Sequence, residues 1–136
     1  MEEGNQDLKI AAAKRFLENY YRTFDANGAD LASLYREESV MIFEGRKLQG
    51  KEAILAELTS LQQCRHQILT IGCQPTPLGS SDLLATVSGN IWLDGKQDAR
   101  LFAQMFMLVP TPEGSFYVSR STFLYLVSEL RGTFVA

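Results

Sequence analysis

The first half of the chain alternates between helical and extended patterns. A broad apolar stripe at helical spacing, with charged residues on its other side, consists of Ala13, Phe16, Leu17, Tyr20, Tyr21 and Phe24. Asn27 and Gly28 tolerate positive φ and end this helix, and Asp30 can cap a short second helix. We expect a strand over 39–43, a turn over 44–47 with a brief return strand at Leu48, and a third helix over 51–61.

After residue 65 the hydrophobic period changes from helical to two. Strands are predicted over 66–73, 82–93, 101–109 and 116–127, and the loops between them are rich in proline and glycine. Helices that precede hairpin-linked strands are typical of an α+β domain with helices on one face of an antiparallel sheet. We find no repeat or linker, so residues 1–136 are expected to form one domain.

On the predicted strands, both alternating sets of residues contain large apolar side chains, so both faces of the sheet are partly apolar. We expect Leu93, Met105 and Met107 to face the helices. The opposite phase would then be exposed, and it contains Trp92, Phe102 and Phe106. Exposed aromatic residues on a sheet favour a protein interface, so this phase predicts a homodimer. The alternative is that the twist of the sheet buries these residues under the chain's own loops.

Charge and cysteine usage narrow the class of protein. The net charge of -3 does not favour a broad phosphate-binding surface, so neither nucleic acid nor a membrane is an expected partner. The polar, acidic N-terminus does not resemble a secretory signal, and no segment is apolar enough to cross a bilayer. Cys64 and Cys73 do not form a CxxC pair, and we interpret them as reduced thiols without a disulfide or a metal.

Six ordered segments resemble the nuclear transport factor 2 family. They are Phe16-Leu17-Glu18-Asn19-Tyr20-Tyr21, Leu34-Tyr35, Phe43-Glu44-Gly45, Leu48-Gln49-Gly50-Lys51, Gln74-Pro75-Thr76 and Phe102-Ala103-Gln104-Met105-Phe106. The resemblance implies a cone-shaped α+β fold with N-terminal helices on a strongly curved antiparallel sheet, and a homodimer formed through that sheet. It also implies a carrier without enzymatic activity or cofactor. Such a carrier binds the GDP form of the GTPase Ran and phenylalanine-glycine nucleoporins, and it works in the cytoplasm, the nucleus and the nuclear pore.

The resemblance further implies where Ran binds. An aromatic side chain of Ran enters an apolar cavity with an acidic rim, where Glu44 matches the rim glutamate, Asp94 a rim aspartate and Asp98 a second acidic residue. Phe43 matches a cavity tryptophan. The other matched cavity positions are Leu61, Ile91, Leu93, Met105 and Phe123.

Two departures from the family pattern concern charge. The last strand reads Arg120-Ser121-Thr122-Phe123-Leu124, where the family usually has Asn-Asp-x-Phe-Arg, so an acidic residue is lost. Lys9 occupies the place of an aromatic residue in the first helix that contributes to nucleoporin binding.

Two alternative functions share this fold. The small subunit of a heterodimeric mRNA export receptor usually has asparagine at the position of Glu44, and it would not form a stable homodimer. An isomerase or dehydratase would need an acid or base in the pocket. His66 is the single histidine, and we interpret it as a hydrogen-bonded core residue.

Overall fold

The computed structural model describes residues 2–61, 63–76 and 80–126. Helices come first and long strands last, which confirms the predicted α+β class. The elements are α1 (Glu2–Ala26), the 3-10 helix η1 (Gly28–Leu34), β1 (Tyr35–Phe43), β2 (Arg46–Gln49), α2 (Lys51–Thr59), β3 (Arg65–Pro75), β4 (Leu83–Trp92), β5 (Arg100–Pro110) and β6 (Phe116–Leu126).

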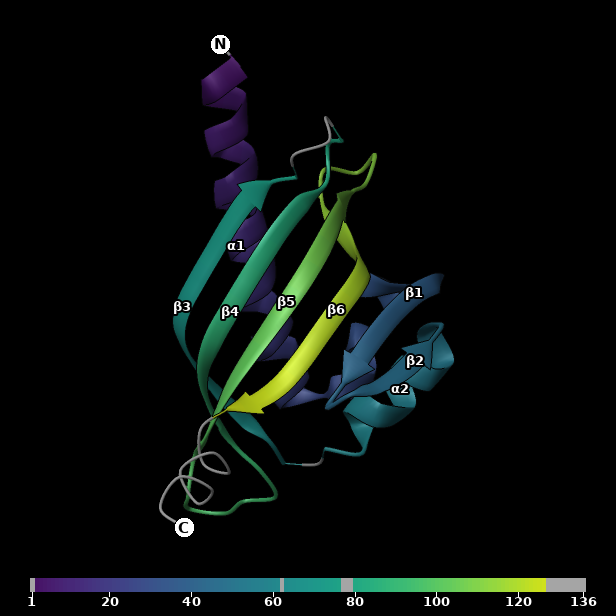
Figure 1. The fold of residues 1–136 in the computed structure, drawn as a ribbon, viewed down its shortest axis with the longest axis vertical. Helices are drawn as coiled ribbons and strands as arrows, with labels where there is room; N and C mark the ends of the chain where they lie inside the picture. The colour runs from purple at the N-terminus through teal and green to yellow at the C-terminus, as the bar shows by residue number, and fades with distance from the viewer. Residues whose placement is uncertain (1, 62, 77–79, 127–136) are drawn as a thin grey trace.

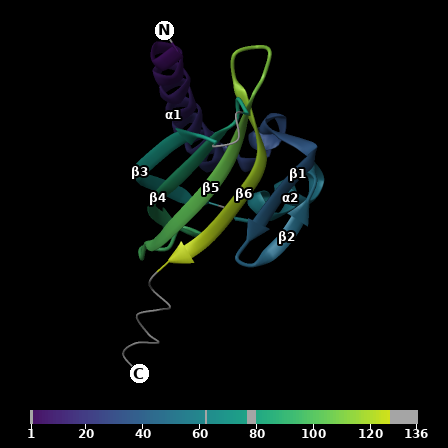
Figure 2. The same cartoon turned by 45° about the horizontal axis from the view of Figure 1, so that its top comes forward.

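The six strands form one sheet in the order β2-β1-β6-β5-β4-β3. All neighbouring strands are antiparallel except β1 and β6, which run parallel. The long strands β3 to β6 lie side by side in front of α1 (Figure 1), and the turned view shows the sheet bending around the helices (Figure 2). The predicted curved sheet with helices on one face is therefore confirmed.

The ends of the helices differ slightly from the prediction. Asn27, in an extended conformation at φ -166°, caps η1, because its side chain accepts a hydrogen bond from the Ala29 N–H at 3.2 Å. Asp30 lies in the first turn of η1 and does not cap it. In the part of the chain that the structure describes, no helix combines the length and the apolar character needed to cross a membrane.

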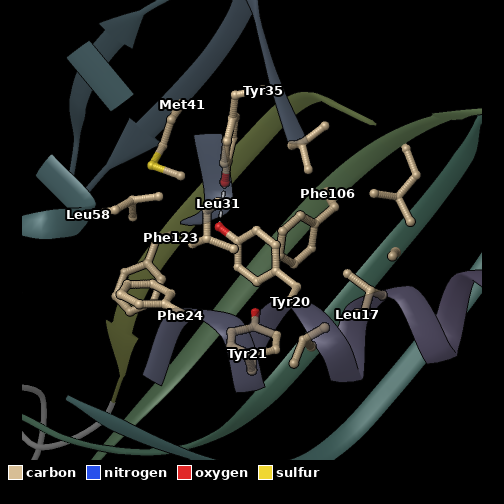
Figure 3. Packing of buried hydrophobic residues seen from close by; sticks show 14 of the residues in the cluster. Leu17, Tyr20, Tyr21, Phe24, Leu31, Tyr35, Met41, Leu58, Phe106 and Phe123 are labelled. Carbon is tan, nitrogen blue, oxygen red and sulfur yellow. Dashed lines mark hydrogen bonds between the residues drawn. The ribbon is translucent and has the colours of Figure 1, made fainter. Parts of the chain in front are cut away.

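The core contains hydroxyl and amide groups that satisfy one another. Tyr20 and Tyr35 are buried, and their hydroxyl groups form a hydrogen bond (Figure 3). Tyr21 donates to Gln104 Oε1 at 2.7 Å, and Gln104 Nε2 donates to Ser121 Oγ at 2.8 Å. Because unpaired polar groups are costly in a core, this chain of bonds fixes α1 against β5 and β6.

The prediction for the two faces of β5 was wrong. Phe102 and Phe106 are 0% and 1% exposed and face the helices, whereas Met105 is 46% exposed on the opposite face. Both phases of this strand are apolar, so periodicity alone cannot orient it. The register of β5 against β4 determines which face is buried. Phe106 pairs with the buried Ala85 of β4, and directly paired residues lie on the same face of a sheet.

Phe102 pairs with Gly89, and the structure shows why position 89 is a glycine. A Cβ atom at residue 89 would lie 2.1 Å from the carbonyl oxygen of Gln67, beside an irregularity of β3 between Ile68 and Thr70. Only glycine allows this close approach of β3 and β4. The sheet bends along these strands (Figure 2), and its buried residues pack with those of α1 in one hydrophobic core.

Candidate functional site

The topology brings two of the predicted rim residues, Glu44 and Asp94, to the same end of the sheet. β1 runs parallel to β6, and β6 and β4 are both antiparallel to β5, so β1, β4 and β6 end together where β3 begins. This end lies at the bottom of Figure 1. Glu44 directly follows β1, and Asp94 follows β4 after Leu93.

Glu44 is exposed but rigidly placed. It forms a two-residue turn with Gly45, and both have positive φ, 49° and 83°, as the tightest hairpin turns require. Its N–H donates to the carbonyl oxygen of Phe123 at 3.0 Å, and its carboxylate accepts from the N–H of Tyr125 at 2.9 Å. Two hydrogen bonds to β6 therefore hold the acidic side chain at the end of the sheet.

An aromatic group lies beside Glu44, formed by Phe43, Phe102, Phe123 and Tyr125. The rings of Phe43 and Phe123 are stacked at 4.9 Å with an angle of 4°, and Phe123 stacks on Phe102 at 5.6 Å with an angle of 8°. Tyr125 stands nearly perpendicular to Phe123 at 5.1 Å. The predicted cavity residues Phe43 and Phe123 thus lie together, both nearly fully buried.

Tyr125 and Arg100 also belong to this site, although no sequence pattern singled them out. The Arg100 guanidinium lies 5.1 Å from the centre of the Tyr125 ring. Burial raises the pKa of Tyr125 to about 12, with the Arg100 charge acting against this shift and the Glu44 charge adding to it. Strand spacing could have identified Tyr125, because residues two apart on a strand share a face and Phe123 was already selected.

His66 lies on the inner side of the aromatic group. Its ring stands at 82° to the Phe102 ring with the centroids 5.2 Å apart, and its side chain is 1% exposed. Asp25, at the end of α1, holds His66 twice: one carboxylate oxygen lies 2.6 Å from Nδ1, and the other accepts the backbone N–H at 2.8 Å. The interpretation of His66 as a hydrogen-bonded core residue is therefore confirmed.

The remaining predicted residues vary in exposure. Ile91 is fully buried and pairs with His66, while Leu61 and Leu93 are half-buried against the core. Asp94, at φ 54°, and Asp98 are exposed in the connection between β4 and β5.

Met105 does not join this group. The expectation that it lines the cavity was wrong, because it points from the outer face of the sheet. Phe102, expected on that outer face, instead forms part of the aromatic group. Phe106 lies deeper in the core, where its ring packs edge-on against Tyr20 at 5.2 Å. Trp92 is half-buried on the outer face, with the Arg65 guanidinium 4.1 Å from its ring centre.

A cavity of about 200 Å³ opens next to the Asp25–His66 pair. Its lining includes Phe24, Asp25, Leu58, Leu61 and Cys64. The Cys64 thiol, which donates to Asp25 at 3.7 Å, connects this cavity to the buried pair. Leu61, a predicted partner-binding residue, thus lies beside a hollow at the end of α1.

Comparison with known proteins identifies close relatives. Residues 12–125 match the model of the nuclear transport factor 2 (NTF2) domain. The chain is 52% identical to nuclear transport factor 2B of Arabidopsis thaliana over 83% of this chain and 90% of that protein. It is 44% identical to nuclear transport factor 2 of Oryza sativa subsp. japonica, over 83% of this chain and 93% of that protein.

The fold agrees with these sequence relationships. The solved structure of nuclear transport factor 2 from Cryptosporidium parvum superposes with a TM-score of 0.76 at 29% identity, covering 85% of this chain and 93% of that one. A domain model that matches most of the chain, relatives above 40% identity and the shared fold agree with one another. The chain belongs to the nuclear transport factor 2 family.

Proposed function

We propose that this chain binds the GDP form of Ran at the end of the sheet where Glu44 and Asp94 lie, and carries it into the nucleus through the nuclear pore. Membership in a family of nuclear transport factors makes the chain a transport factor and not one of the enzymes that share this fold. The observation that carries the Ran proposal is the position of Glu44, whose carboxylate is fixed beside a buried aromatic group.

The chemistry of this site suits a partner that offers an aromatic side chain next to a basic one. The aromatic side chain would pack on the half-buried Tyr125, whose ring stands on the buried Phe123. A favourable aromatic pair adds about 0.5–1.5 kcal/mol beyond the area it buries. Glu44 and Asp94 would pair with basic residues of Ran, which orients the encounter and raises its rate. Leu61 and Leu93, both half-buried, would extend the apolar contact, and Asp98 would add a further negative charge.

The departure at Arg120-Ser121 does not weaken this proposal. Ser121, which stands where the family usually has an acidic residue, is 3% exposed and accepts a hydrogen bond from Gln104 inside the core. The loss of this acidic residue therefore changes the interior of the protein and not the charge of its surface. Arg120 is exposed and lines a shallow hollow of the outer face together with Met105 and Thr122. Its charge therefore lies on the other side of the sheet from the aromatic group.

A homodimer is part of the proposal, with its interface on the outer face of the sheet. Exposed apolar side chains gather there on two neighbouring strands: Leu101 is 37%, Met105 46% and Leu124 43% exposed. Trp92, from the outward phase of β4, would contribute at one end. A stable interface of this kind buries on the order of 1,200–2,000 Å² in total. Phe102 and Phe106 have no part in it, because each monomer buries them in its own core.

Binding to phenylalanine-glycine nucleoporins completes the carrier function and would depend on the first helix. Leu8 is 71% exposed there and offers an apolar contact. Lys9 bonds to the carbonyl oxygen of Ser81 and offers none. We therefore propose a weaker nucleoporin contact than an aromatic residue at this position would give.

The test is a direct binding measurement with purified Ran. Titration calorimetry against Ran loaded with GDP should give a saturable signal, and Ran loaded with a GTP analogue should give none. Light scattering on the same sample should give the mass of a dimer. Equal binding to both nucleotide forms, or to neither, would contradict the proposal. A monomer that pairs only with a larger partner would favour the export-receptor subunit.

A further inference from the structure

Three side chains with metal-binding atoms meet where α1 ends and β3 begins. They are Asp25, Cys64 and His66, and one ligand atom from each lies within 4.8 Å of the other two. The Cys64 sulfur is 3.7 Å from Asp25 Oδ1, and His66 Nδ1 is 2.6 Å from the same oxygen. Cys64 is 6% exposed and the His66 side chain 1%, whereas the Asp25 side chain is 23% exposed and gives access from solvent.

The backbone explains why these residues converge. Cys64 and His66 are two residues apart where the chain enters β3, and such residues point to the same side of an extended chain. Asp25 reaches them from the last turn of α1, and its second oxygen is anchored by the N–H of His66 at 2.8 Å. The cluster is thus held by two separate elements, as a rigid metal site requires.

The surroundings of His66 show which of its ring nitrogens could bind a metal ion. Nε2 is buried and has no hydrogen-bond partner in the described part of the chain. The rings of Tyr21, Phe24 and Phe102 surround the imidazole at centroid distances of 4.8, 4.9 and 5.2 Å. These rings offer no metal ligand, so Nδ1, which lies 2.6 Å from Asp25 Oδ1, is the nitrogen of His66 that would bind a metal ion.

We propose that Asp25, Cys64 and His66 form a site for a divalent transition metal of the zinc type, with a fourth position open to solvent. Carboxylate, thiolate and imidazole together form a ligand set that suits zinc. Metal–ligand distances of about 2.0–2.3 Å place neighbouring tetrahedral ligands about 3.3–3.6 Å apart. The Cys64–Asp25 separation of 3.7 Å nearly meets this value, and the His66–Asp25 contact of 2.6 Å has to widen. The cavity of about 200 Å³ lined by Asp25 and Cys64 has room for a water ligand.

Proton balance makes binding depend on pH. The metal replaces the thiol proton of Cys64 and takes the place of the hydrogen bond between His66 Nδ1 and Asp25. Burial, followed by the Asp25 charge, raises the pKa of Cys64 to about 12, so the metal-free thiol is protonated at neutral pH. The metal ion supplies the positive charge that stabilises the thiolate. Affinity should therefore rise with pH, and each bound ion should release protons.

The experiment uses the metal ions alone and does not involve Ran, so its outcome is separate from that of the proposed function. Full-length protein, freed of metal with a chelator and kept reduced with a phosphine, is titrated with Co²⁺ in a spectrophotometer and with Zn²⁺ in a calorimeter. We expect one ion per chain, a thiolate-to-cobalt charge-transfer band and the visible bands of tetrahedral cobalt. Zinc should also raise the melting temperature.

Two cysteine variants give a matched comparison. Cys64→Ala should lose the charge-transfer band and bind zinc at least about 100-fold more weakly, since even outer-shell partners of metal ligands matter about 10–100-fold. Cys73→Ala, which changes the other free cysteine, should behave as the wild type. Asp25→Asn, checked for folding by circular dichroism, should also lose tight binding. A wild type without the charge-transfer band, or a Cys64→Ala variant that keeps its affinity, would overturn the site.

Discussion

Reversing the charge of Glu44 is the sharpest test of the Ran site. Glu44→Lys removes a carboxylate that accepts the Tyr125 N–H at 2.9 Å at the edge of the aromatic group. The backbone N–H of residue 44 would still donate to the carbonyl oxygen of Phe123, and Gly45 would still complete the turn. The perturbation is therefore confined to one exposed side chain.

Its effects on folding and on binding should differ in size. Loss of one exposed hydrogen bond costs about 0.5–1.5 kcal/mol of unfolding free energy. Truncating one partner of a desolvated ion pair costs about 2–5 kcal/mol of binding free energy, and a reversed charge adds repulsion. With about 1.4 kcal/mol per tenfold change, Glu44→Lys should weaken binding to Ran-GDP by at least about 30-fold and up to about 4,000-fold.

Two further variants separate charge from structure. Glu44→Gln keeps an oxygen that can accept the Tyr125 N–H but removes the charge, so it should lose affinity near the lower end of that range while folding normally. Glu113→Lys reverses a charge in the loop at the opposite end of the sheet and should bind Ran-GDP as the wild type does. Calorimetry gives the affinities, and light scattering and thermal melting report on dimer and fold. If folded Glu44→Lys binds Ran-GDP within threefold of the wild type, the site is misplaced.

Other variants and conditions test the remaining proposals. Asp94→Lys should weaken Ran-GDP binding at least ~10-fold in the same calorimetric assay, as expected for a lost ion pair at the rim. Met105→Glu places a charge on the outer face of the sheet and should halve the mass seen by light scattering; an unchanged mass would exclude this face as the dimer interface. Lys9→Trp exchanges the bond to Ser81 for an aromatic surface and should tighten binding to phenylalanine-glycine repeats in a surface-plasmon experiment, where an unchanged affinity would count against a groove at α1. Burial raises the pKa of Tyr20 from 10.0 to about 12, so this tyrosine loses its proton at a lower pH in the unfolded chain than in the folded protein. The unfolding free energy measured by urea titration should therefore stay constant up to about pH 10 and fall between pH 10 and 12.

The sequence predicted the orientation of a helix or strand wherever one of its faces is polar. The stripe around Leu17 and Tyr20 oriented α1, because charged residues occupy its other side. In β4 the buried Val87 and Ile91 alternate with more polar positions, and Leu93, in the same phase, packs against the core as expected. In β5 both faces are apolar, so the orientation follows from pairing with β4, which hydrophobicity does not encode. Because of that ambiguity, Phe102 was predicted on the outer face and Met105 on the inner face, the reverse of what the structure shows.

The functional residues could be predicted only where they lie close together in the sequence. Glu44 and Phe43 were found because they occur together in one short recognisable segment. The contact of Asp25 with Cys64 and His66 joins residues far apart in the chain, and no short motif marks it. Cys64 and Cys73 are not closely spaced, so Cys64 was interpreted as a simple thiol. Only the packing of the end of α1 against the start of β3 reveals the cluster.

The parallel pairing of β1 with β6 has a consequence for how the protein is made. Residues 35–43 leave the ribosome early, but the strand that pairs with them, residues 118–123, is among the last described parts of the chain to be synthesised. Until then, β1 has only the short β2 as a neighbour and β5 lacks its partner on one side. A nascent chain therefore exposes two unpaired strand edges, which are prone to aggregate. Folding of the sheet should complete only after β6 has emerged, and general chaperones that shield strand edges should increase the yield.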